Sequence, residues 1–158
     1  MSEMDRERAL AAILKPVQSR YDFILIDCPP SLGLLTTNAL AASDSVLIPL
    51  QSDYLAMRGA ELLLSTIEKV RKKLNPNLSL LGVLVTMYDA RTSHARGVLE
   101  QVRSAFGDRT FKAVVAYSVS AKDSSAAGQS ILAYDPASAV AKSYRTLADE
   151  ILAYAEAA

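Results

Sequence analysis

The sequence predicts an α/β fold in which helices flank a mostly parallel sheet. Short apolar runs alternate along the chain with longer stretches whose apolar residues recur at helical spacing. The run Ser45–Leu50 is apolar on both faces, which is typical of a parallel strand that helices cover on each side. The 158 residues contain no internal repeat and no low-complexity linker, so we expect a single domain over residues 1–158.

The elements of the first half follow from the spacing of apolar residues and from the positions of capping residues and prolines. Pro16 is expected to loosen the end of the first helix because it lacks a backbone N–H. Ser52 or Asp53 can cap the longest helix. In chain order we expect a helix over 4–19, a strand over 22–27, a helix over about 34–42, a strand over 45–50 and a helix ending near Lys73.

The second half continues the same alternation. Asn75–Asn77 encloses a proline and predicts a turn, and Gly107 with Asp108 is expected to end a helix. Small and polar residues over 118–135 indicate a loop or a short helix. The remaining expected elements are a strand over 80–87, a helix over about 93–105, a strand over 111–117 and a helix over about 136–156.

The most informative stretch is 22–31. Asp22–Ile26 reads as a buried strand that ends in a carboxylate, Asp27, and Pro29 and Pro30 prevent the strand from continuing. Ligands of α/β sheets bind at the carboxyl ends of the strands, and nucleotide hydrolases place an acid there, the Walker B aspartate, to hold Mg²⁺ beside phosphates. Asp27 alone would be an ordinary turn residue, so the functional interpretation depends on the strand before it and the prolines after it.

The companion motif of such a site is absent from the sequence. No G-x-x-x-x-G-K-[ST] phosphate loop occurs, and no lysine follows a glycine. The single cysteine, Cys28, has no basic neighbour that would activate its thiol, and His94 is the only histidine. A histidine-based zinc site and a Ser-His-Asp triad therefore gain no support. The sequence predicts one half of a nucleotide site.

Composition narrows the classes of partner. Seventeen basic and seventeen acidic residues balance, so nucleic-acid binding would need a local basic patch. A lone cysteine suits a reducing cytoplasm, and no apolar run is long enough to span a bilayer. The stretch from Leu147 onward is acidic and rich in alanine, which disfavours binding to anionic lipid. We therefore expect a cytoplasmic protein that does not bind membranes.

Four blocks of residues resemble the ParA/Soj family of chromosome- and plasmid-partitioning ATPases. They are Tyr21–Leu40, Ala42–Pro49, Leu84–Thr92 and Tyr134–Pro136, and they keep the order of the family. The resemblance implies an incomplete P-loop NTPase fold of the deviant-Walker, SIMIBI type. It also implies a homodimer that encloses ATP and Mg²⁺, binds non-specific DNA at the nucleoid, and is stimulated by a ParB-like centromere-binding or cargo adaptor protein.

The same resemblance assigns roles to individual residues. Asp27 corresponds to the acid near Mg²⁺, acting through water. Pro29, Pro30, Ser31 and Gly33 correspond to the switch loop that senses the γ-phosphate, and Met87 lies near the adenine.

The chain departs from the family in two ways. In the family the phosphate-binding loop and the water-positioning acid precede the region resembled here, so no catalytic residue is expected within this chain. The segment Ala116–Gly128 and the residues after Pro136 lack arginines that the family often carries there, so DNA binding is expected to be weakened.

Two interpretations of function follow. The chain is either the carboxyl-terminal portion of a partitioning ATPase, unable to hydrolyse ATP alone, or a non-catalytic ParA-like interaction and dimerisation module. If the fold follows the family, a phosphate-loop strand from outside the chain belongs between strands 22–27 and 45–50. Without it, those two strands either pair with each other or keep exposed edges that favour association.

Overall fold

A computed structural model describes residues 6–157 of the chain, except residues 30 and 32. The described residues form two compact units. Residues up to 46 together with 59–81 form the first unit, and residues 47–58 together with 82–158 form the second. The prediction of a single domain stays a prediction.

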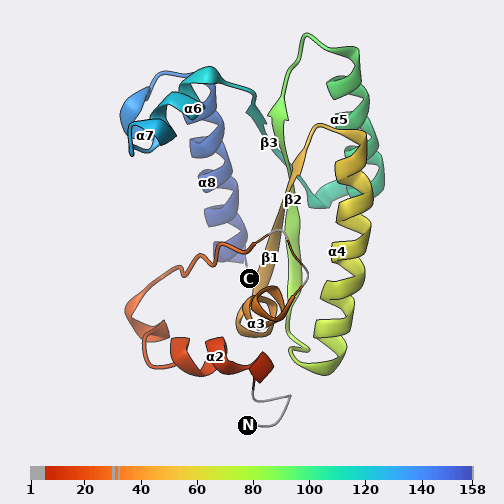
Figure 1. Cartoon of the computed structure of the whole chain (residues 1–158), viewed down its shortest axis with the longest axis vertical. Helices are drawn as coiled ribbons and strands as arrows, with labels where there is room; N and C mark the ends of the chain where they lie inside the picture. The colour runs from red at the N-terminus through yellow and green to blue at the C-terminus, as the bar shows by residue number, and fades with distance from the viewer. Residues whose placement is uncertain (1–5, 30, 32, 158) are drawn as a thin grey trace. The chain divides into compact units, whose positions relative to one another are not determined.

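Most of the expected helices and strands are confirmed, with ends that shift by a few residues. The structure contains α2 (Ala9–Leu14), η1 (Gln18–Arg20), α3 (Leu34–Ala42), β1 (Ser45–Gln51), α4 (Tyr54–Lys73), β2 (Ser79–Tyr88), α5 (Ser93–Phe106), η2 (Gly107–Arg109), β3 (Thr110–Ala116), α6 (Val119–Ala126), α7 (Ile131–Tyr134) and α8 (Ala139–Ala157) (Figure 1). The expected helix over 4–19 is shorter than predicted. It ends before Pro16, and a 3₁₀ turn follows, since proline has no N–H to continue the hydrogen-bond series.

In the described residues the sheet has three strands in the order β1-β2-β3, which confirms a parallel sheet flanked by helices. Strand β2 runs parallel to β3, with Val83 opposite Thr110 and Val85 opposite Val114. A step of two residues along β2 thus corresponds to a step of four along β3, so the register between the two strands shifts between these pairs.

In the second unit, helices α5 and α8 lie on opposite sides of β2 and β3 (Figure 1). Val83, Val85 and Val102 are fully buried, as is Ala141 of α8, and Val140 of the same helix is only 2% exposed. These side chains form the core because strands covered on both faces present apolar residues to each layer.

In the first unit, one buried side chain joins α2 to α3. The Asn38 amide donates hydrogen bonds to the carbonyls of Arg6 and Leu34 at 2.7 and 3.0 Å, and its Oδ1 accepts one from the Leu10 N–H at 3.1 Å. Asn75 acts similarly at the other end of α3, where its Nδ2 donates to the carbonyls of Leu40 and Ser43. Both asparagines satisfy backbone groups that the helix ends leave open.

The prediction of a buried strand over 22–27 is wrong. Asp22 to Pro29 contain no helix or strand, and most of their apolar residues are exposed, Leu25 by 91% and Phe23 by 48%. A strand forms only where a neighbouring backbone accepts and donates its hydrogen bonds. Among the described strands, β1 is the first in the sheet order and does not pair with this segment.

Candidate functional site

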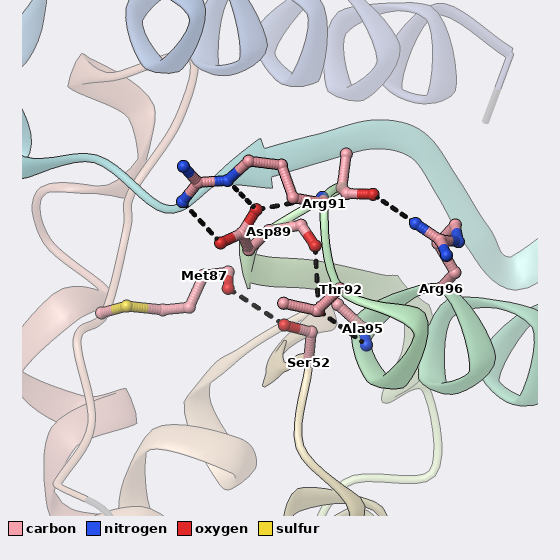
Figure 2. A network of polar contacts seen from close by, with 8 residues as sticks. Ser52, Met87, Asp89, Arg91, Thr92, Ala95 and Arg96 are labelled. Atoms are coloured by element: carbon pink, nitrogen blue, oxygen red, sulfur yellow. Dashed lines mark hydrogen bonds and ion pairs between the residues drawn. The ribbon is translucent and has the colours of Figure 1, made fainter.

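The carboxyl end of β2 carries an unusual backbone conformation at Met87. Its φ of +53° lies in the left-handed region, which a bulky side chain occupies at a cost of about 1–3 kcal/mol. The Ser52 N–H donates to the Thr86 carbonyl at 3.0 Å. The Ser52 hydroxyl donates to the Met87 carbonyl, also at 3.0 Å (Figure 2). The residue after β1 thus holds the turn after β2, and the Met87 side chain is half exposed.

The turn that follows is fixed by side chains of its own residues. Arg91 binds the Asp89 carboxylate with two parallel hydrogen bonds, from Nε at 2.9 Å and from Nη2 at 2.8 Å (Figure 2). Thr92 caps α5 by accepting a hydrogen bond from the Ala95 N–H at 3.2 Å. Arg96 reaches back from α5 to the Ala90 carbonyl at 2.7 Å. These bonds give the turn one defined shape at the sheet's carboxyl edge.

The family resemblance predicted Met87 near the adenine, whereas Ser52 was expected only as a possible helix cap and Asp89 was not expected at a site. A usable signal was present for Asp89, because an aspartate two residues before an arginine, followed by a threonine, suits an Asx turn that leads into a capped helix. Ser52 carried no such signal, since its partner lies on another strand.

The contact with Arg91 controls the titration of Asp89. Hydrogen bonds from the Arg91 side chain and then from its backbone N–H lower the pKa of Asp89 to about 2. The same contact raises the pKa of Arg91. Because the pKa of this carboxyl is lowered by folding, its contribution to stability is present above the ordinary aspartate pKa and is lost as the pH falls from about 4 toward 2.

An NMR titration of the Asp89 carboxyl checks this pair. We expect a midpoint near 2 in the wild type and a midpoint that rises toward about 3.9 in Arg91→Gln. Arg96→Gln is the matched control, because Arg96 contacts the Ala90 carbonyl and not the carboxylate. An unchanged midpoint in Arg91→Gln would show that Arg91 does not lower the pKa.

The other predicted site residues lie in the first unit. Asp27 and Pro29 are exposed on the segment without regular structure, so Asp27 does not end a paired strand. Gly33 is the N-cap of α3, and its carbonyl accepts hydrogen bonds from the Thr37 N–H and hydroxyl. The Ser31 carbonyl accepts one from Thr36. Pro30 lies outside the described residues.

Cys28 neighbours Asp27 and is an exposed free thiol. Burial, and after it the charge of Asp27, raise the pKa of this thiol. A raised pKa lowers the fraction of thiolate, which is the reactive form. The raised pKa agrees with the absence of a basic residue near Cys28 in the sequence.

The residues that are present do not by themselves fit Mg²⁺-ATP. Asp27 is exposed, and no three histidine, cysteine, aspartate or glutamate side chains cluster as metal ligands within the described part of the chain. Mg²⁺ is usually bound by one or two carboxylates together with substrate phosphates. The sequence contains no loop to cradle those phosphates, so Asp27 would need a partner segment to form a site.

Comparison with known proteins identifies the family. A family model described as an AAA domain matches residues 1–80. The chromosome-partitioning ATPase Soj of Treponema pallidum is 48% identical over 153 residues, which cover 97% of this chain and 60% of that protein. The chain belongs to the ParA/Soj-type partitioning ATPase family.

Solved structures agree with this family. A structure from Mycobacterium smegmatis, described as cobyrinic acid a,c-diamide synthase with bound ADP and magnesium, is 42% identical, with a TM-score of 0.66 over 72% of this chain and 46% of that one. The cell division ATPase MinD of Pyrococcus furiosus has a TM-score of 0.74 over 94% of this chain and 59% of that one. At 23% identity, MinD supports the P-loop ATPase fold alone.

This ParA/Soj-type chain spans about half to three-fifths of the length of the curated relatives that it matches, from 48% to 60%. In the described residues no helix is both long and apolar enough to cross a membrane.

Proposed function

We propose that the chain is the carboxyl-terminal portion of a ParA/Soj-type partitioning ATPase and hydrolyses ATP only together with the upstream part of such a protein. The observation that carries this proposal is the 48% identity to Treponema Soj over nearly the whole chain, combined with coverage of only 60% of Soj. The absence of a phosphate loop from the sequence supports the dependence on an upstream part.

In the proposed assembly, Asp27 is the Walker B acid beside Mg²⁺. A strand from the upstream part would pair with the segment from Asp22 to Asp27, whose apolar side chains are now mostly exposed, and would bring the carboxylate to a sheet edge. Pro29, Pro30, Ser31 and Gly33 form the loop that senses the γ-phosphate, and Met87 contacts the adenine.

The complete protein would act as a homodimer in the cytoplasm. It would enclose ATP and Mg²⁺ between its subunits, bind non-specific DNA of the nucleoid weakly, and be stimulated by a ParB-like partner. The relatives named as chromosome-partitioning proteins support this assignment.

A chimera tests the proposal. The upstream part of Treponema Soj, which this chain does not cover, is fused to residues 1–158, and Mg²⁺-dependent ATP binding and hydrolysis are measured for the chimera and for the chain alone. We expect no measurable ATP binding by the chain alone, because the principal ligands of the β- and γ-phosphates are missing. We expect hydrolysis by the chimera.

Substitutions in the chimera then test Asp27. Asp27→Ala is expected to lower the rate of hydrolysis roughly 10²-fold, as loss of an electrostatic stabiliser does in other enzymes. Asp22→Asn is the matched control, since Asp22 is an exposed acid of the same segment and should leave the rate within about twofold of wild type.

Two results would contradict the proposal: micromolar ATP binding by the chain alone, or unchanged hydrolysis in the Asp27→Ala chimera. An inactive chimera, together with binding of the chain alone to intact Soj, would favour the non-catalytic interaction module instead.

A further inference from the structure

Two neighbouring backbone N–H groups of β3 donate hydrogen bonds to one carboxylate. Glu150 of α8 accepts a hydrogen bond from the Lys112 N–H at 2.9 Å through Oε2, and from the Ala113 N–H at 2.7 Å through Oε1. In a regular strand, successive N–H groups point to opposite edges. Here both N–H groups face Glu150 of α8, in the part of β3 where the register with β2 shifts between Thr110 and Val114.

A second residue of α8 holds the same segment. Tyr154 lies four residues after Glu150 and hence on the same face of the helix. Its ring packs edge-to-face on Phe111, with 6.1 Å between centroids and an interplanar angle of 82°. Its hydroxyl donates to the Asp108 carbonyl at 3.4 Å. Glu150 and Tyr154 thus bind the backbone and side chains of residues 108–113 from one helix face.

Strand β3 lies at the edge of the sheet, so these contacts affect whether another strand can pair with it. It is the last strand in the sheet order β1-β2-β3, and an edge strand with free N–H groups is a template on which another chain can add a strand. A carboxylate has two acceptor oxygens and forms short, charge-assisted hydrogen bonds with backbone donors. Glu150 therefore satisfies the donors that a neighbouring strand would otherwise use.

We infer that Glu150 is a latch that closes the β3 edge: its carboxylate replaces a neighbouring strand and keeps a second copy of this chain from pairing with β3 while α8 is docked. This inference is independent of the proposed ATPase, because it concerns α8 and β3 alone. Helix α8 thus satisfies backbone donors of β3 in addition to packing its apolar side chains in the core.

Amide hydrogen exchange of the full chain, followed by NMR, tests the latch. In Glu150→Ala we expect exchange at Lys112 and Ala113 to become about tenfold faster or more, relative to the amides of Val83 and Val85 in β2, since each amide loses a bond to a charged acceptor. Size-exclusion chromatography with light scattering should then show dimers that increase with protein concentration.

Two further variants keep the test decisive. Glu150→Gln has nearly the same shape but presents an NH₂ group to one of the two N–H donors. It should therefore accelerate exchange at one or both amides. This variant also serves as the test if Glu150→Ala does not fold. Glu156→Gln removes an exposed charge from the same helix and should change nothing. Unchanged relative exchange at Lys112 and Ala113 in Glu150→Gln, or a monomer at every concentration in a folded Glu150→Ala, would overturn the inference.

Discussion

Gly82→Ala is expected to lower the free energy of unfolding by about 1–3 kcal/mol, because overpacking of a buried site displaces its neighbours. A Cβ at position 82 would lie 2.7 Å from Cε2 of Phe111 and 2.8 Å from the Arg109 carbonyl oxygen. The Phe111 ring is almost completely buried, and the carbonyl belongs to the backbone, so neither atom moves easily. Denaturation with guanidinium chloride, followed by circular dichroism, measures the change.

Gly97→Ala is the matched control for this substitution and has the opposite expected sign. Position 97 lies within α5, and a Cβ there would meet nothing within 4 Å. Alanine in a helix interior is about 0.5–1 kcal/mol more favourable than glycine. A denaturation midpoint of Gly82→Ala at or above that of the wild type would contradict the close approach of β2 to Phe111.

Asn38→Ala is expected to destabilise the chain by about 1–3 kcal/mol, because it leaves buried backbone groups without partners. The side chain is only 8% exposed. Its removal takes one acceptor from the Leu10 N–H and one donor from the Arg6 carbonyl. The loss should appear both in the denaturation midpoint and as faster amide exchange at Leu10.

Thr37→Ala is the control for Asn38. Its hydroxyl bonds to the Gly33 carbonyl within the same helix, and water can replace that exposed bond, so the change should stay within about 0.5 kcal/mol. If Asn38→Ala proved as mild as Thr37→Ala, the hydrogen bonds of Asn38 would not stabilise the junction of α2 and α3.

Sequence patterns predicted the elements whose formation depends on local spacing. The helices near 34–42, 54–73 and 93–106 and the strands near 45–51, 79–88 and 110–116 all appear where apolar periodicity placed them. The family resemblance predicted that Met87 lies near the adenine, and this stays a prediction. The family was also predicted, because the residue blocks that resemble it can be read directly from the sequence without knowledge of the fold.

Other features depended on partners that are distant in the sequence. The Met87 carbonyl, at a residue with positive φ, accepts a hydrogen bond from Ser52. The stretch of β3 whose register shifts donates hydrogen bonds to Glu150 of α8. No local pattern marks either pair, because each partner lies on a separate element that only folding brings into contact. Asn38 is a further example, since its hydrogen bonds to α2 cross almost thirty residues of sequence.

By itself, the sequence determined the family, the order of most helices and strands, and an aspartate at position 27 followed by prolines. The tertiary structure alone decided that Asp22 to Asp27 remain without a strand and that most of their apolar side chains are exposed. The physical reason is that an apolar helix face can be recognised from one segment, whereas a β-strand exists only when a neighbouring backbone takes up its hydrogen bonds.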